Sequence, residues 1–187
     1  MTWQELEILI IDFSEKLNSA LRELGILNEV SLLSADHVGL RLKENTQVDA
    51  LKQEMLSVGD IISATDVNGR EIIIFQLRSP LQVGTWSVCG VEVPYPKPGH
   101  AYQDGWEHIE FVLSESENSM DALRNEFFRV FPQLTKEALE EKYAYKEDVP
   151  HAEGDQMTNP SICLKVNGVG IKFHANPIQV VVGYQNV

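Results

Sequence analysis

The sequence has few cysteines and no long apolar run. Its 187 residues include only Cys89 and Cys163, which are too few for a disulfide framework and lack the spacing of a zinc or redox motif. Both lie in apolar stretches, a pattern that favours buried free thiols in a reducing compartment. No apolar run reaches the ~18 residues that cross a bilayer, so we expect no membrane segment.

Basic residues are also scarce. Fifteen Lys and Arg residues stand against 28 Asp and Glu residues, which gives a formal net charge of −13. Such a chain lacks the basic face that neutralises nucleic-acid phosphates, and anionic lipid would repel it. The first twelve residues contain no Lys or Arg, whereas a secretory signal begins with a positive region. We therefore expect a cytoplasmic protein that binds neither nucleic acid nor membrane.

Short sequence motifs of well-known enzymes are missing too. The chain contains no GxGxxG, GxxxxGK[ST], GxSxG or HExxH motif, which argues against the common nucleotide-binding, hydrolase and metalloprotease sites. A DxDxDG calcium loop is absent as well. The hydrophobic fraction of 43% and charged fraction of 23% are those of an ordinary globular protein.

Hydrophobic spacing predicts helices and strands in turn. A long helix begins with a capping box at Thr2 and Glu5 and ends at Gly25. Asn68-Gly69 and Asn167-Gly168 indicate hairpins with type I′ turns. The other expected helices cover 46–59, 120–132 and 135–142. The expected strands cover 35–42, 61–66, 71–77 (ended by Pro80), 84–93, 106–113, 162–166 and 169–174. One more strand is expected in the polar stretch before residue 158.

The order of strand, helix and three strands occurs twice. His37 and His108 occupy matching positions, in Ala35-Asp36-His37 and Trp106-Glu107-His108. Two βαβββ modules explain this repeat and the length of the chain. We therefore expect an α+β fold in one domain, 1–187, with an N-terminal helical segment at 1–30, a first module at 31–100 and a second at 101–187.

Alternation along the strands sorts side chains onto two faces. His37 and Arg41 lie opposite Val38 and Leu40, and the same parity holds on three other strands. The residues expected on faces turned away from the helices are His37, Arg41, Glu92, His108, Glu110, Lys172 and His174.

Imidazoles and carboxylates that converge in this way are ligands for a divalent cation. His37 and His108, with one or two of Glu92 and His174, would hold the ion, which would polarise a substrate oxygen while Glu110 moves a proton. Arg41 or Lys172 would bind an anionic substrate. His100 and His151 lie in loop-like sequence and receive no role.

Two other interpretations of the same residues remain open. An antiparallel sheet turns polar residues to solvent without any function. The residues would also suit a non-catalytic module that binds a small molecule, a metal or a partner, in which Lys172 paired with Glu110 neutralises the cleft without a metal.

The chain resembles the YecM family of bacterial proteins. The residues that carry the resemblance are Ala35-Asp36-His37 with Leu40-Arg41, Asn68-Gly69-Arg70, Val91-Glu92 with Pro94-Tyr95-Pro96, Gly105 to Glu110, Asn159-Pro160 and Ile171-Lys172-Phe173-His174. They extend from about Leu32 to Ala175. The family has no established reaction, so the resemblance implies an uncharacterised protein.

The resemblance also implies a vicinal oxygen chelate fold, as in glyoxalases, bleomycin-resistance proteins and dihydroxybiphenyl dioxygenases. There, two βαβββ modules form a cleft, and their first and last strands supply metal ligands. On this chain those ligands are His37, Glu92, His108 and His174, the last in place of the usual Glu. The resemblance implies a zinc, nickel, manganese or iron cofactor. The activity that it implies is that of an isomerase, lyase or oxygenase on a small anionic molecule. The oligomeric state that it implies is a monomer or a homodimer.

Overall fold

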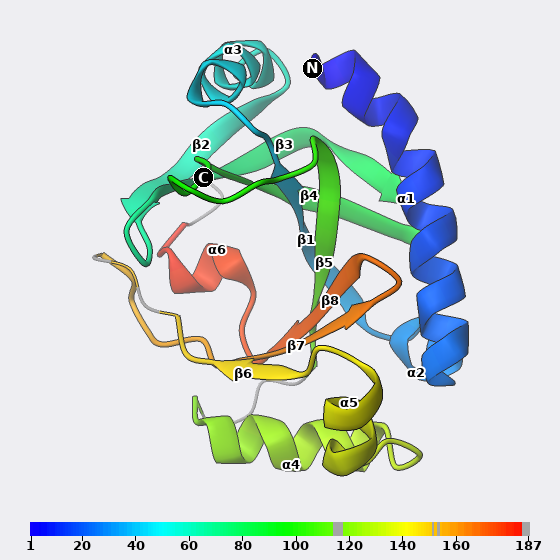
Figure 1. Ribbon diagram of the computed structural model, residues 1–187. Helices are drawn as coiled ribbons and strands as arrows, with labels where there is room; N and C mark the ends of the chain where they lie inside the picture. Colours follow the sequence, from blue (N-terminus) through cyan, green and yellow to red (C-terminus); the bar gives the residue numbers. More distant parts are fainter. Residues whose placement is uncertain (114–117, 151, 153, 185–187) are drawn as a thin grey trace.

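Eight strands form a single sheet in the order β2-β3-β4-β1-β5-β8-β7-β6. This computed structural model describes all residues except 114–117, 151, 153 and 185–187, and the described part contains six helices (Figure 1). The mixed α+β class and the N-terminal helix expected from the sequence are confirmed. No helix in this described part is long and apolar enough to span a membrane.

Helix α1 (Trp3–Leu24) crosses one face of the sheet and contacts β3, β5 and β8. The Thr2 hydroxyl accepts from the Glu5 backbone N–H at 3.2 Å, and the Glu5 carboxylate accepts from the Thr2 backbone at 2.7 Å. Gly25, with φ of 70°, ends the helix, as the sequence predicted. A four-residue helix, α2 (Leu27–Val30), then leads into the sheet.

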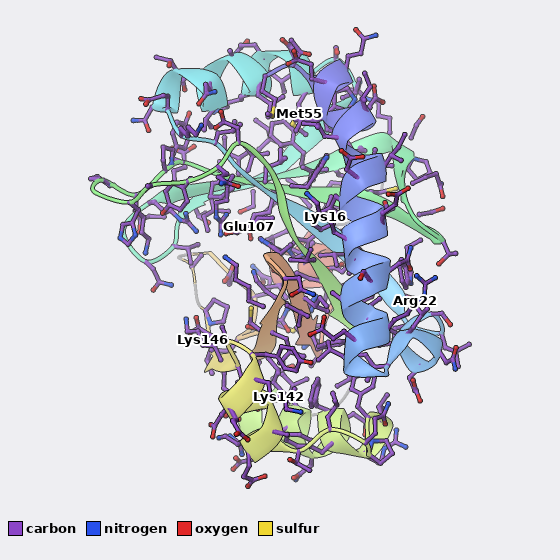
Figure 2. All side chains as sticks on the ribbon, turned by 45° about the vertical axis from the view of Figure 1, so that its right-hand side comes forward. Lys16, Arg22, Met55, Glu107, Lys142 and Lys146 are labelled. Atoms are coloured by element: carbon purple, nitrogen blue, oxygen red, sulfur yellow. The ribbon has the colours of Figure 1, made fainter. Side chains whose placement is uncertain are left out.

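The first half of the sheet contains β1 (Ser34–Arg41), α3 (Asn45–Met55), β2 (Gly59–Asp66), β3 (Glu71–Val83) and β4 (Trp86–Pro94). Helix α3 touches the N-terminal end of α1, where the Trp3 backbone N–H donates to Glu54 at 2.9 Å, and Met55 lies at the same end in Figure 2. The Asn68-Gly69 turn is confirmed, since both residues have positive φ, 55° and 81°.

Three predicted boundaries in this half are wrong. Helix α3 stops at Met55, four residues before Gly59, which instead begins β2 because its missing Cβ allows the Gln76 carbonyl to approach. Pro80 does not end β3, because the ladder with β4 shifts register between Gln76 and Leu81 and so accommodates a residue without an N–H. Gly84, with φ of 61°, forms the turn before β4 rather than part of the strand.

The second half contains β5 (Gly105–Val112), α4 (Met120–Val130), α5 (Lys136–Lys142), β6 (Lys146–Asp148), β7 (Ser161–Val166), β8 (Val169–His174) and α6 (Ile178–Val181). The short helix and the strand hidden in the polar stretch are confirmed. Helix α6 was not predicted, and it lies on the side of the sheet away from α1 (Figure 1). The prediction that both thiols are buried is wrong, because Cys89 and Cys163 are free and only partly buried.

The first and last strands of the two halves meet in the middle of the sheet. Strand β1 pairs with β4 in parallel and with β5 antiparallel, and β5 pairs with β8 in parallel. Two register shifts interrupt the β1–β5 ladder. They leave Asp36 and Glu107 as extra residues, each directly before a histidine.

Candidate metal centre

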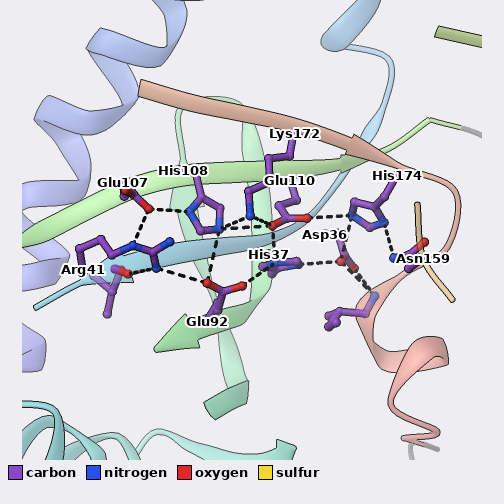
Figure 3. A network of polar contacts seen from close by, with 12 residues as sticks. Asp36, His37, Arg41, Glu92, Glu107, His108, Glu110, Asn159, Lys172 and His174 are labelled. Carbon is purple, nitrogen blue, oxygen red and sulfur yellow. Dashed lines mark hydrogen bonds and ion pairs between the residues drawn. The ribbon is translucent and has the colours of Figure 1, made fainter. Parts of the chain in front are cut away.

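Two histidines and two glutamates from β1, β4 and β5 meet on the face away from α1 (Figure 3). Glu110 Oε1 lies 3.1 Å from His37 Nε2 and 3.3 Å from His108 Nε2. Glu92 lies 4.0 and 3.8 Å from the same two nitrogens. One ligand atom from each of the four residues lies within 4.8 Å of the others.

A carboxylate orients each imidazole. Asp36 Oδ2 lies 2.8 Å from His37 Nδ1, and Glu107 Oε2 lies 3.3 Å from His108 Nδ1. An oxygen acceptor at Nδ1 places the ring proton there, so Nε2 faces the cluster. The bulges make this contact, because strict alternation would turn each acid away from the histidine that follows it.

Three glycines create space for the imidazoles. A Cβ at Gly90 would lie 2.6 Å from His37 Cβ, and one at Gly170 would lie 2.7 Å from His108 Cβ. A Cβ at Gly39 would overlap the His108 ring, at 2.0 Å from Cε1. These strands can therefore carry the two histidines only with glycine at these neighbouring positions.

Arg41 and Lys172, expected to bind substrate, are both paired inside the protein. Lys172 Nζ lies 2.5 Å from Glu110 Oε1 and 3.2 Å from His108 Nε2. Arg41 Nη1 lies 3.4 Å from Glu92, and its Nε lies 2.8 Å from Glu107. The two cations thus neutralise part of the acidic cluster.

His174 stands apart from the first group and joins Asp36 and His37 in a second set of candidate ligands. Its Nδ1 lies 2.6 Å from the carbonyl oxygen of Asn176 and 3.0 Å from the side-chain amide nitrogen of Asn159. In the tautomer in which Nδ1 donates to the carbonyl, Nε2 of the neutral ring is a lone pair, and it faces Asp36 at 3.4 Å and Glu110 at 3.8 Å. This buried atom has no hydrogen-bond partner among the described residues, and two carboxylates with a lone pair form a cradle suited to a cation.

Burial and charge move the pKa values of the cluster in opposite directions. Burial lowers the pKa of His37, but the Glu110 and Asp36 carboxylates outweigh it and raise the value to about 10. Burial raises the pKa of Glu92, but Lys172 and His108 outweigh it and lower the value to about 2. Lys172 and His37 likewise hold the pKa of Glu110 well below its usual range against burial. For His174 burial dominates and lowers the pKa, which favours the neutral ring.

The donor set fits a divalent cation in charge as well as in chemistry. Four carboxylates, those of Asp36, Glu92, Glu107 and Glu110, face two side-chain cations. With His37 protonated, as its raised pKa of about 10 indicates, three cations face the four carboxylates and one negative charge is left in excess. A metal ion that binds at His37 Nε2 would displace that proton and balance the charge of the cluster.

Sequence reasoning missed two of these carboxylates. Asp36 and Glu107 received no role, although each directly precedes one of the matching histidines, and that repeated acid-histidine pair was the available signal. His100 is exposed, and His151 lies outside the described residues.

His37, Glu92 and Glu110 of the cluster line a cavity of about 360 Å³, which His174 also lines; His108 is not among its lining residues. Residues from β2, β3, β7 and α6 complete its wall, among them Thr65, Ile74, Cys163 and Val181. Two larger hollows, of about 580 and 590 Å³, lie beside α1, and none of their described lining residues is a histidine. The smaller cavity is therefore the one that combines space for a small molecule with candidate metal ligands.

A family model, two curated proteins and a solved structure are similar to this chain. The family model described as YecM protein matches residues 3–185. Protein YecM of Escherichia coli (strain K12) is 30% identical over 171 residues, which cover 91% of this chain and 87% of that protein. An uncharacterised protein of Haemophilus influenzae is 30% identical over 176 residues, covering 89% and 86%. A solved structure titled "Structural Genomics, Protein EC4020" has a TM-score of 0.78 at 27% identity and covers 98% of this chain and 92% of its own.

Proposed function

The chain belongs to the YecM family, and we propose that it binds a divalent cation with His37, Glu92, His108 and Glu110. One observation carries the proposal: ligand atoms of these four residues lie within 4.8 Å of one another, and a carboxylate on Nδ1 orients each imidazole. Imidazole and carboxylate ligands suit zinc, nickel, manganese and iron. Such an ion supplies Lewis-acid polarisation of a substrate oxygen or, in the case of iron and manganese, dioxygen chemistry.

Within this proposal Glu110 is a ligand rather than the proton acceptor that the sequence suggested. Lys172 lies 2.5 Å from its Oε1, and the pKa of Glu110 is held well below its usual range, which makes this carboxylate a weak base. Its second oxygen, Oε2, faces His174. We place His174 beside the cation cluster, where its lone pair extends the cradle formed by Asp36 and Glu110.

We further propose an isomerase, lyase or oxygenase activity on a small anionic molecule in the cavity. The vicinal oxygen chelate architecture, with one domain, 1–187, and modules at 31–100 and 101–187, belongs to the same proposal. Its support is the chain order of strand, helix and three strands from Ser34 to Pro94, and the meeting of first and last strands at the centre of the sheet. Fold similarity alone does not decide the reaction.

One observation favours a second candidate, a non-catalytic binding module. The Lys172 ammonium lies within hydrogen-bonding distance of both Glu110 and His108, where it neutralises part of the cluster without a metal. In that case the cavity binds a small molecule beside a self-contained polar network. For a cation to bind, the Lys172 side chain must move away from His108 Nε2.

Calorimetric titration of chelator-treated protein with Zn²⁺, Ni²⁺, Mn²⁺ and Fe²⁺ (the last under argon) separates these candidates. The metal-binding proposal predicts about one ion per chain, lost in the His37→Ala/His108→Ala variant and kept in His100→Ala, whose histidine is exposed. If the unsubstituted chain takes up none of the four ions, or binds them equally well without His37 and His108, the second candidate replaces the first.

A further inference from the structure

The Arg70 side chain projects into the same cavity as the candidate metal ligands. Arg70 follows the turn between β2 and β3, and this turn is fixed locally. Gly69 N–H donates to the Asp66 carboxylate at 2.9 Å, and Val67 N–H donates to the Arg70 carbonyl at 2.9 Å. The backbone that carries the guanidinium is therefore held in place before any ligand arrives.

Three other cations that line the cavity have carboxylate partners. Arg41 contacts Glu92 and Glu107, Lys172 contacts Glu110, and Lys146 contacts Asp148 at 2.5 Å. The Arg70 guanidinium, in contrast, forms no hydrogen bond or ion pair within the described part of the chain, and its buried Nε has no partner there.

An unpaired, half-buried guanidinium is unexpected in a chain with 28 acidic and 15 basic side chains. Burial and the nearby Arg41 charge lower the pKa of Arg70, and the carboxylates of Glu92 and Glu107 offset this only in part. Planar guanidinium groups bind carboxylate and phosphate through two parallel hydrogen bonds. No carboxylate of the described residues forms a hydrogen bond or ion pair with Arg70, so an external anion is the natural partner.

We propose that Arg70 binds the carboxylate or phosphate group of the small ligand whose other oxygens face the cluster of His37 and Glu92. This inference rests on the proposed function and names its substrate class, a small molecule with one terminal anionic group. Thr65, Ile72 and Ile74, which line the cavity with Arg70, would contact the ligand between the two ends. Lys97, also on the cavity wall, supplies a second positive charge near the mouth. Arg41, engaged by two carboxylates, is not the anion-binding residue.

Calorimetric titration of the full chain with inorganic phosphate, malonate and succinate tests this inference. We expect Arg70→Ala to weaken binding of the preferred anion roughly 10- to 100-fold, as expected for loss of a charge-assisted hydrogen-bonded pair, and Arg70→Lys to recover part of it. Arg78→Ala is the matched control, because Arg78 is exposed and pairs with Asp60 at 2.7 Å. Comparing the titration with phosphate with those with malonate and succinate shows whether Arg70 prefers a phosphate or a carboxylate group.

Metal binding by the same variants keeps this test separate from the proposed function. Arg70→Ala should take up as much metal as the unsubstituted chain. Anion binding that is equal with and without Arg70, or absent for all three probes, would overturn the inference whatever the metal result. Arg70-dependent anion binding in a chain that takes up no metal would support the inference and overturn the metal-binding proposal.

Discussion

The two halves of the sheet support their histidines in the same way. His37 on β1 pairs with Gly90 on β4, and His108 on β5 pairs with Gly170 on β8. In both halves the preceding acidic residue lies in a bulge and contacts Nδ1. The halves share little sequence, so the shared geometry comes from backbone pairing and one glycine each.

The halves differ two residues further along their last strands. Glu92 lies there in the first half, opposite Gly39, and Lys172 lies there in the second, opposite Glu110. One half therefore adds an anion to the cluster and the other adds a cation. The backbone support for a histidine is therefore built twice, whereas the two halves contribute opposite charges to the cluster.

The largest expected effect comes from filling the space beside each histidine. We expect Gly90→Ala to lower the free energy of unfolding by about 3 kcal/mol and Gly170→Ala by about 2 kcal/mol. Both new Cβ atoms meet a histidine Cβ, but the one at Gly90 also lies 2.9 Å from the Asp36 carbonyl oxygen, whereas at Gly170 the nearest carbonyl is 3.4 Å away. Urea denaturation measures both. Losses below about 0.5 kcal/mol would show that the strands move apart freely and that glycine is not required.

Removing the negative charge behind each imidazole should weaken metal binding without removing a ligand. We expect Asp36→Asn and Glu107→Gln to lower the affinity about 10- to 100-fold. Asp36→Asn should have the larger effect, because its contact with His37 is shorter and it also accepts from the Ile178 N–H of α6 at 3.0 Å. Calorimetric titration provides the measurement, with the exposed Glu15→Gln on α1 as control. Unchanged affinity in both variants would contradict the orienting role of the bulges.

Exchanging the charges that distinguish the halves should move the affinity in opposite directions. We expect Lys172→Met to raise the affinity for the cation about 10-fold, because the ammonium no longer competes for Glu110, and Glu92→Gln to lower it by a similar factor. Lys142→Met, exposed at the end of α5 and away from the cluster, should change nothing. Weaker binding in Lys172→Met would mean that Lys172 supports the site rather than competes with the ion.

The smallest effect concerns the outer part of the second half. Glu147 accepts from Arg124, Lys136 and Tyr145, and its pKa is lowered to about 2, chiefly by the Arg124 hydrogen bonds. A carboxyl with a lowered folded-state pKa stabilises the fold above its unfolded value of 4.5, and this contribution is lost as the pH falls towards 2. We therefore expect Glu147→Gln to cost about 1 kcal/mol at pH 6, after allowing for solvent screening, and progressively less below pH 4.5. Denaturation at a series of pH values measures this; a difference that does not change with pH would contradict it.

Regular spacing made most of the fold predictable. The capping box at Thr2, the Asn-Gly turns and the alternation that places His37 and Arg41 on one face are local signals, and the structure contains them all. Pro80 was misleading because a register shift, which depends on the neighbouring strand, tolerates it. Rules that consider only residues close together in the sequence take no account of how one strand pairs with the next.

The same limit explains what was missed at the site. Asp36 and Glu107 contact the histidines only because bulges in the β1–β5 ladder break the alternation. The division of the histidines into two groups that share His37, and the lack of a partner for Arg70 Nε, arise from contacts between segments far apart in the chain. Residue types and their alternation along the strands therefore predicted the members of the cluster. The contacts that each member makes became known only from the three-dimensional structure.

The most direct test of the central claim is anomalous X-ray diffraction from crystals soaked with Zn²⁺ or Mn²⁺. The account predicts one peak bounded by His37 Nε2, His108 Nε2, Glu92 and Glu110, with the Lys172 ammonium displaced from Glu110. A map without a peak there, in which Lys172 still contacts Glu110 and His108, would contradict it and identify the cluster as a polar network that is complete without a metal.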